Sequence, residues 1–179
     1  QELIERIGAP FEQDVRYFFG ENQSEQVELF RKVIQKYWIN GIKDSAKTFE
    51  GIHQMLEELK EKGYKLAVCS NASKWELDVI LKKLEVKDYF DVIQGVTEKN
   101  NKKYSLEELL LREKPELAVM VGDRSYDNEA ARYNQIPFVG CKYGYGKPEE
   151  LRECQYTIET VLELPKIIDK IVSIRGGTA

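Results

Sequence analysis

Cysteine and histidine are scarce in this sequence, and their scarcity excludes several kinds of site. Cys69, Cys141 and Cys154 lie far apart in the 179 residues and form no C-x-x-C pair. Three separated cysteines favour reduced thiols and a cytoplasmic location over a disulfide framework or a zinc site. His53 is the only histidine, which excludes triads and zinc sites that use several histidines.

The sequence also lacks an excess of charge of one sign and a long apolar run. Its 27 lysine and arginine residues are interspersed with 31 aspartate and glutamate residues, for a net charge of −4. No basic stripe marks a nucleic-acid partner, no apolar run is long enough to span a membrane, and no secretory signal peptide is visible. Apolar residues at 42% and charged residues at 32% are typical of a soluble globular protein of one α/β domain.

Hydrophobic periodicity predicts helices first and a sheet afterwards. Residues 1 to about 47 show apolar residues at helical spacing, with charges between them. Short apolar runs then alternate with helical segments of about ten residues, which implies βαβ units, a parallel sheet and an α/β fold. In such sheets ligands bind outside the carboxyl ends of the strands. We predict strands at 64–70, 90–96, 117–122 and 137–141, and residues 156–160 precede a last predicted helix.

Two aspartates follow the predicted strand at 117–122. In "VMVGDRSYD", Asp123 comes directly after the strand and Asp127 stands four residues later. One acid at this place could simply cap a helix, but two at this spacing indicate a cation. Carboxylate oxygens are the ligands that Mg²⁺ prefers, and this ion leaves places for substrate phosphate and water.

A hydroxyl and an ammonium group complete the predicted pocket. "LAVCS" ends at Ser70, Asn71 follows it, and "NNKKYSLEELL" places adjacent lysines before a helix. Each of these features alone is more often a turn or a solvated helix face. If the segments converge, the hydroxyl and a lysine hold phosphoryl oxygens while the carboxylates hold the ion. Such a site stabilises a phosphoryl group in transfer.

The order of these motifs resembles that of the haloacid dehalogenase-like (HAD) hydrolase superfamily, in particular its phosphoglycolate phosphatase-like branch with a helical cap. "IGAPFEQDV" is similar to the cap segment, and "FVGCKYGYGKPEELRE" is similar to a Gly-Tyr-Gly loop of that branch. The resemblance implies a Rossmann-like parallel sheet with a small α-helical cap, residues 1–47 being part of the cap and 48–179 the core. It also implies a Mg²⁺-dependent phosphatase that acts on a small phosphorylated metabolite. We expect a monomer or a homodimer.

The resemblance assigns roles to the motif residues. Ser70 and Asn71 would bind the phosphate, Asp123 would bind Mg²⁺ directly, and Asp127 would bind the ion or position its water. The lysine that the family carries next to the phosphate is Lys102 or Lys103. Lys102 has leucines at the fourth, seventh and eighth positions after it, which fits the following helix slightly better.

The first motif of the family, Asp-x-Asp-x-Thr at the end of an apolar strand, does not occur in the sequence. By the resemblance, this motif supplies the nucleophile that forms an aspartyl-phosphate, so we expect the 179 residues to be inactive alone. The missing strand would lie between the strands that end near Ser70 and Asp123. These two strands should therefore flank a strand from outside the 179 residues, flank one swapped from another copy, or pair directly. An unfilled slot would leave buried backbone groups unsatisfied, at about 1–3 kcal/mol each, and such a sheet should not persist.

Other functions remain open at this point. A haloacid dehalogenase attacks carbon and needs no metal, which would leave Asp123 and Asp127 unexplained. A phosphomutase would share the same core residues. A non-catalytic binding or regulatory protein on a HAD scaffold would explain the missing nucleophile, but not why Ser70, Lys102 and both aspartates are present.

Overall fold

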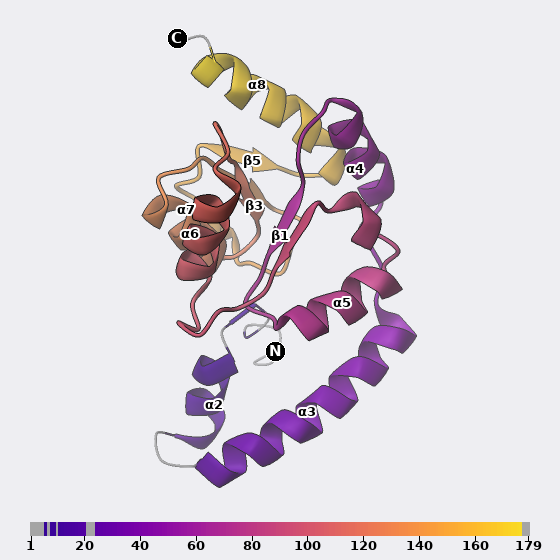
Figure 1. The fold of residues 1–179 in the computed structure, drawn as a ribbon, viewed down its shortest axis with the longest axis vertical. Helices are drawn as coiled ribbons and strands as arrows, with labels where there is room; N and C mark the ends of the chain where they lie inside the picture. Colours follow the sequence, from indigo (N-terminus) through magenta and orange to yellow (C-terminus); the bar gives the residue numbers. More distant parts are fainter. Residues whose placement is uncertain (1–5, 7, 10, 21–23, 177–179) are drawn as a thin grey trace.

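The computed structural model describes residues 6, 8, 9, 11–20 and 24–176, and its elements alternate as the periodicity predicts (Figure 1). The four predicted strands are present, each shorter than its apolar run because only the paired residues form strand, and residues 156–158 form a fifth strand that was not predicted. The helices are α2 (Phe11–Phe19), α3 (Ser24–Ser45), α4 (Ile52–Glu61), α5 (Lys74–Lys83), α6 (Lys102–Glu113), α7 (Ser125–Tyr133) and α8 (Leu164–Gly176). The strands are β1 (Ala67–Cys69), β2 (Val92–Gln94), β3 (Met120–Gly122), β4 (Phe138–Cys141) and β5 (Tyr156–Ile158). Short 3-10 turns are η1 (Lys87–Tyr89), η2 (Pro148–Leu151) and η3 (Val161–Glu163).

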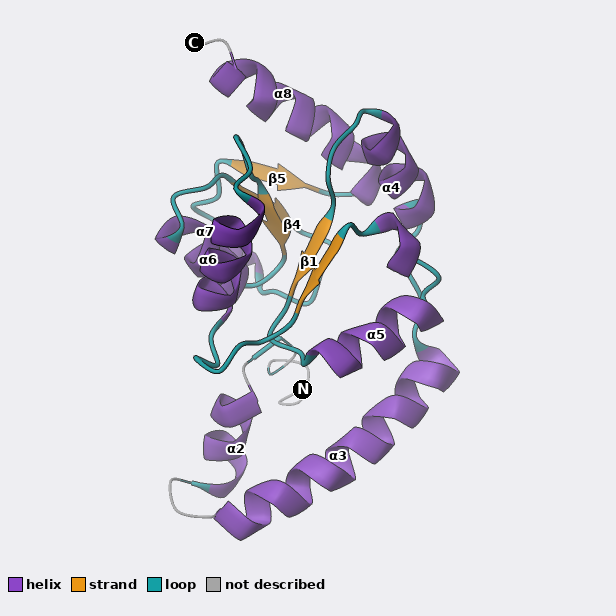
Figure 2. Cartoon of the chain, in the orientation of Figure 1, coloured by secondary structure: helices purple, strands orange, loops and turns teal. Residues whose placement is uncertain are grey.

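The strands pair in parallel, which confirms the predicted α/β class. β1 pairs with β2, and Val68 lies opposite Ile93. β4 pairs with β3 on one side and with β5 on the other, and Val121 lies opposite Val139. Each pair joins strands that follow one another along the chain (Figure 2). Parallel pairing places the carboxyl ends of the strands within each sheet at the same edge, where a site is expected.

The sheet is divided between β1 and β3. β1 and β2 form one sheet, and β3, β4 and β5 form another, with no pairing between β1 and β3 in the part of the chain that the structure describes. Direct pairing of these two strands, one of the three expected arrangements, is therefore wrong. The other two arrangements, which involve a strand from outside the 179 residues or from another copy, stay predictions.

The expectation that a divided sheet would not persist also needs correction. β1 and β3 each keep a partner strand on the other side. Val68 of β1 and Val121 of β3 both pack against the same cluster of buried residues. Packing between side chains thus joins the two half-sheets where backbone hydrogen bonds do not.

Two clusters of buried side chains fill the interior. The larger cluster joins α4 and α8 to β4 and β5, and it includes Leu56, Ile158 and Ile171. The smaller cluster joins α6 and α7 to β3 and β4, and it includes Leu106 and Ala130. Figures 1 and 2 show the strands between these two groups of helices. The strands thus form the middle layer of an α/β/α arrangement.

Local sequence explains where several helices begin and end. Ser73 caps α5 through a capping box, in which its Oγ accepts from the N–H of Glu76 and Glu76 accepts from the N–H of Ser73. Asn101 caps α6, because its Oδ1 accepts from the N–H of Lys103 at 3.1 Å. Gly63, predicted to stop α4, follows that helix with a φ of +82°, which favours glycine.

The helices α2 and α3 lie apart from the strands, at the bottom of Figure 1, where α3 runs beside α5. Phe30 of α3 packs against Phe11 and Phe19 of α2, with ring centroids 6.0 and 4.7 Å away. The hydroxyl of Tyr126, next to β3, donates to Oε1 of Gln13 in α2 at 3.2 Å. The division into a cap at 1–47 and a core at 48–179 stays a prediction.

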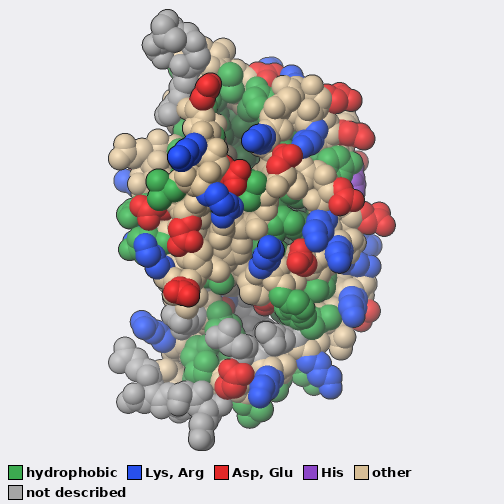
Figure 3. Space-filling view, in the orientation of Figure 1, with side chains coloured by type: hydrophobic (Ala, Val, Ile, Leu, Met, Phe, Trp, Pro, Cys, Tyr) green, Lys and Arg blue, Asp and Glu red, His purple; other side chains and the backbone are tan. Residues whose placement is uncertain are grey.

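Charged side chains of both signs are mixed over the face shown in Figure 3, as the sequence predicts. In the described residues, every helix is too short or too polar to cross a bilayer. The cysteines Cys69, Cys141 and Cys154 are all free thiols.

Candidate active site

The carboxyl end of β1 lies close to the starts of α6 and α7. Cys69, the last residue of β1, is half-buried, and loss of solvent around its thiol raises the pKa of that group to about 11. The ammonium of Lys102 lowers that pKa and the carboxylate of Asp127 raises it, so both charges lie near the thiol. Ser70 follows directly, and its N–H donates to the carbonyl of Gln94 at 3.0 Å. The end of β1 thus lies near Lys102 and Asp127, while the predicted proximity of Ser70 to Asp123 stays a prediction.

Asp127 is buried and fully engaged by the protein. Its Oδ1 accepts from Nζ of Lys102 at 2.5 Å, and its Oδ2 accepts from the N–H groups of Asp123 and Arg124, both at 3.1 Å. The residue is 4% exposed. A side chain at Gly122 would have its Cβ 2.3 Å from the Asp127 carboxylate, so only glycine fits there. Asp127 therefore fixes the turn after β3 and the lysine at the same time.

Lys102 and Lys103, which spacing alone left as alternatives, lie in different places. Lys102 reaches Asp127 across the gap between α6 and α7. Nζ of Lys103 instead lies 4.9 Å from the ring centroid of Tyr104 and 5.3 Å from that of Tyr133. Of the two lysines, the structure brings Lys102 to the predicted site.

Asp123 is held by the loop that follows β4. Its Oδ2 accepts from the N–H of Tyr145 at 2.6 Å and from the N–H of Gly146 at 3.3 Å. Its Oδ1 makes no hydrogen bond or ion pair within the described residues. A Cβ at Gly144 would lie 2.2 Å from the side chain of Asp123, and one at Gly146 would lie 1.8 Å from its carbonyl oxygen. Both glycines of the Gly-Tyr-Gly loop are thus required by this close approach.

Ser70 and Asn71, the two residues after β1, differ in which hydrogen-bond donors they leave free for a ligand. Oγ of Ser70 accepts from the N–H of Ala72 at 3.1 Å, which leaves its own proton free to donate. Nδ2 of Asn71 donates to the carbonyl of Gly8 at 2.9 Å, while its Oδ1 is buried without a partner among the described residues. The side-chain donor that Asn71 would offer to a phosphate therefore contacts the N-terminal segment instead.

Sequence reasoning missed Glu150 of η2. Its Oε2 accepts from the N–H of Ser125 and Nε of Arg124, and its Oε1 accepts from the N–H of Lys147. Burial acts to raise the pKa of Glu150, but these hydrogen bonds outweigh it and hold the pKa below its usual value. The signal was the acid at the third position of a turn that begins with Pro148, where a carboxylate caps its own helix start.

Cys141 and Tyr143 also lie beside Asp123. Burial raises the pKa of Cys141 to about 11, and the Asp123 carboxylate contributes in the same direction. Burial and a hydrogen bond with Cys141 raise the pKa of Tyr143 well above its usual value. Both groups are therefore neutral at physiological pH and add no charge beside Asp123.

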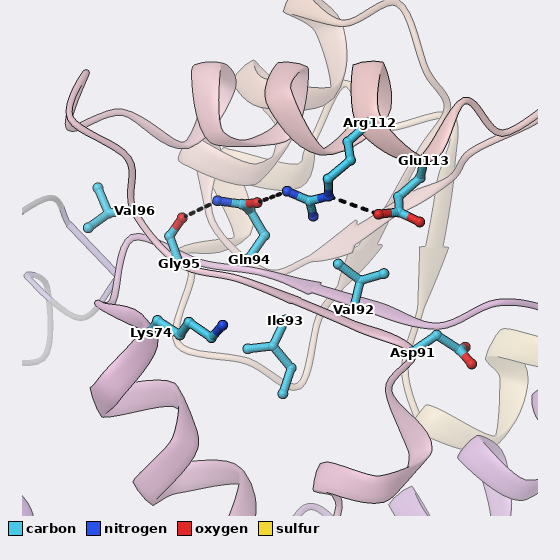
Figure 4. A pocket seen from close by; sticks show the side chains of 9 residues that line it. All are labelled: Lys74, Asp91, Val92, Ile93, Gln94, Gly95, Val96, Arg112 and Glu113. Atoms are coloured by element: carbon cyan, nitrogen blue, oxygen red, sulfur yellow. Dashed lines mark hydrogen bonds and ion pairs between the residues drawn. The ribbon is translucent and has the colours of Figure 1, made fainter.

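A groove of about 580 Å³ lies elsewhere, along the free edge of β2 between α5 and α6 (Figure 4). Arg112 donates to Oε1 of Gln94 at 3.0 Å and to Oε1 of Glu113 at 2.9 Å on one wall. Lys74 projects from the start of α5 on the other. The lining carries both signs of charge and includes none of the predicted site residues.

The residues present fit a divalent cation at Asp123. Within the described residues, no three carboxylate, thiol or imidazole groups converge. Asp123 nevertheless presents one carboxylate oxygen without a protein partner, which is the kind of ligand that Mg²⁺ takes. Asp127 has both oxygens engaged and stands behind Asp123 as its support.

Comparison with known families identifies the class of protein to which this parallel α/β fold belongs. The model of the haloacid dehalogenase-like hydrolase family matches residues 1–141, and the chain belongs to this family. Among curated relatives, the chain is 32% identical over 130 residues to a phosphoglycolate phosphatase of Salmonella typhi, covering 70% of this chain and 52% of that protein. It is 28% identical over 160 residues to the tyrosine-protein kinase PtkA of Mycobacterium tuberculosis (strain ATCC 25618 / H37Rv), covering 86% and 54%. The chain thus spans about half the length of these relatives.

Solved structures share the fold. A predicted phosphatase from Clostridium acetobutylicum is 26% identical with a TM-score of 0.78, covering 94% of this chain and 81% of that one. CbbY from Rhodobacter sphaeroides, solved with phosphate, has a TM-score of 0.75 at 19% identity, covering 91% and 79%. The second likeness shows the fold alone.

Proposed function

We propose that this protein is a Mg²⁺-dependent phosphatase that hydrolyses a small phosphate monoester, using a nucleophilic aspartate from outside these 179 residues. The observation that carries the proposal is the linked set of Lys102, Asp127 and Asp123 at the carboxyl ends of the strands, where one oxygen of Asp123 is free. The family membership and the named phosphatase relative support it.

Ser70 and Lys102 would hold the phosphoryl oxygens. The hydroxyl of Ser70 is oriented by the N–H of Ala72 and keeps its proton for a substrate oxygen. The ammonium of Lys102 is fixed by Asp127 and has further N–H groups to donate. A fixed hydroxyl and a fixed cation stabilise the charge of a phosphoryl group without having to reorganise during the reaction.

Asp123 would bind the metal through Oδ1, while Oδ2 stays with the loop after β4. When bound, Mg²⁺ would supply positive charge to phosphoryl oxygens. The hydrogen bonds of Asp127 favour a positioning role over direct ligation, because a second cation would have to displace either Lys102 or two backbone N–H groups.

The chemistry needs a carboxylate that the sequence does not contain, since no Asp-x-Asp occurs in it. We place this carboxylate at the end of a strand between β1 and β3. It would attack phosphorus, the bond from phosphorus to the ester oxygen would break, and the leaving alcohol would take a proton from the second aspartate of the same Asp-x-Asp motif, which the attacking water would later restore. Water would then hydrolyse the aspartyl-phosphate to release phosphate and regenerate the carboxylate. We propose a cytoplasmic protein, monomeric or homodimeric, that lacks activity without this strand.

The test is a phosphate-release assay on a chain that also carries an apolar strand ending in Asp-x-Asp-x-Thr, read from the coding sequence upstream. We expect Mg²⁺-dependent release from at least one small phosphate monoester, and none from the 179 residues alone. Absence of such a strand upstream would favour the non-catalytic alternative instead. Metal-independent release of halide from a haloacid would favour a dehalogenase, and phosphoryl transfer between positions of one substrate would favour a mutase.

A further inference from the structure

Glu150 joins the two loops that surround Asp123. Its Oε2 accepts from the N–H of Ser125, the first residue of α7, at 2.7 Å, and from Nε of Arg124 at 3.2 Å. Its Oε1 accepts from the N–H of Lys147 at 3.0 Å. One carboxylate therefore holds the start of α7 and the end of the Gly-Tyr-Gly loop together.

Asp123 connects the same two segments from the other side. It lies in the loop before α7, and its Oδ2 accepts from the N–H groups of Tyr145 and Gly146, at 2.6 and 3.3 Å, just before Lys147. The carboxylates of Asp123 and Glu150 thus link the same two loops in opposite directions. Removing the link through Glu150 leaves the orientation of Asp123 to its own two hydrogen bonds.

The link through Glu150 is sheltered from water. The side chains of Arg124 and Glu150 are 12% and 17% exposed. Hydrogen bonds with one charged partner are stronger than neutral ones, and partial burial reduces their competition with solvent. Such a link can hold a ligand oxygen in one place, which a solvated surface pair does not do.

We propose that Glu150 is a positioning residue for the metal ligand Asp123. It fixes the two loops so that Oδ1 of Asp123 faces the reacting group while Oδ2 stays with the loop after β4. The role goes beyond the metal site proposed above and rests on it, because Glu150 acts only through Asp123.

Amide hydrogen exchange tests the mechanical half of the proposal without metal or substrate. In Glu150→Ala, the amides of Tyr145 and Gly146 do not lose a direct partner, yet we expect them to exchange at least about tenfold faster. Amides of β4 should keep their rates. The control is Glu149→Ala, since Glu149 is 60% exposed and pairs with Arg152 on the surface. A folded Glu150→Ala protein with unchanged exchange at Tyr145 and Gly146 would overturn the proposal.

Metal binding tests the functional half. Terbium(III) is a suitable probe because Tyr145 donates its N–H to Asp123 and Tyr143 lies beside Asp123, so a tyrosine can sensitise its luminescence. We expect Glu150→Ala to weaken terbium binding, and Mg²⁺ competition with it, by about tenfold. Glu150→Gln should lie between that variant and the unchanged protein, because an amide keeps one acceptor oxygen. It also serves as the test variant if Glu150→Ala does not fold.

The outcomes separate this proposal from the metal site itself. Terbium binding that is lost in Asp123→Asn but unchanged in both Glu150 variants would overturn the role of Glu150 and keep the metal site. Terbium binding that does not depend on Asp123 would overturn the metal site, and the role of Glu150 with it.

Discussion

Lys102 and Asp127 lie 25 positions apart in the sequence, and their ion pair joins the start of α6 to the start of α7. Both side chains are largely buried, at 13% and 6% exposure. The adjacent Lys103 turns to the rings of Tyr104 and Tyr133 instead. Two neighbouring lysines thus have different surroundings, and each serves as a control for the other.

Lys102→Ala should destabilise the protein by about 3 kcal/mol, because it leaves the Asp127 carboxylate buried without its cation. Lys103→Ala should cost less than about 1 kcal/mol, since it removes only cation–π contacts near the surface. Urea unfolding of both variants measures the difference. Equal losses would contradict the assignment of Lys102 as the buried partner.

Asp123→Asn should leave the fold intact and remove most phosphatase activity of a chain that contains the nucleophile. The amide keeps nearly the same shape and can still accept from Tyr145 and Gly146, but it loses the negative charge that a divalent ion needs. Circular dichroism and phosphate release report the two effects. Full turnover in this variant would contradict the metal assignment.

Gly146→Ala should destabilise the loop after β4, because its Cβ would lie 1.8 Å from the carbonyl oxygen of Asp123 and the backbone must move. We expect a loss of about 1–3 kcal/mol. Gly41→Ala is the matched control, since Gly41 lies within α3 with no atom within 4 Å of the added Cβ. It should be neutral or stabilising by up to about 1 kcal/mol. Thermal unfolding that ranks the two variants the other way would contradict the close approach.

Cys69 and Cys141 should resist alkylation at pH 8. A raised pKa means less thiolate at a given pH, and a pKa of about 11 leaves about one thiol in a thousand ionised at pH 8. Reactivity should appear only as the pH approaches 11. Cys154 is less buried, so mass spectrometry should find it modified first. Earlier modification of Cys69 or Cys141 would show that their surroundings are more open.

A strand supplied from outside should bind between β1 and β3. We expect a synthetic peptide with an apolar run ending in Asp-x-Asp-x-Thr to slow amide exchange in β1 and β3, because it would pair with the facing edges of both. A scrambled peptide of the same composition is the control. Equal effects of the two peptides would contradict a specific slot.

Much of the fold could be predicted from single segments. Each apolar run followed by a helical period became a strand and a helix, and Gly63 ended α4 as expected, because these outcomes depend on local sequence. The division of the sheet between β1 and β3 could not be read this way. Pairing depends on which strand edges meet in space. The apolar run of β1 or β3 does not indicate which strand will lie beside it.

The candidate site could likewise be predicted only where a side chain's place depends on local sequence. Asp123 and Ser70 could be placed because each directly follows a strand. Spacing could not separate Lys102 from Lys103, since adjacent residues differ by about 100° around a helix and both allow a buried leucine face. Glu150 went unnoticed because its partners belong to two separate segments: Ser125 begins α7 and Lys147 lies in the loop after β4.

The pairing of strands that are neighbours along the chain has a consequence for folding kinetics. The contacts of β1 with β2, and of β3 with β4 and β5, join residues closer in the sequence than the contacts between α4 and α8, so they cost less loop-closure entropy to form. The halves meet through longer-range contacts, such as those between α4 and α8. Bringing α8 against α4 requires most of the chain between them to be ordered first. We therefore expect the docking of α8 on α4 to limit the folding rate.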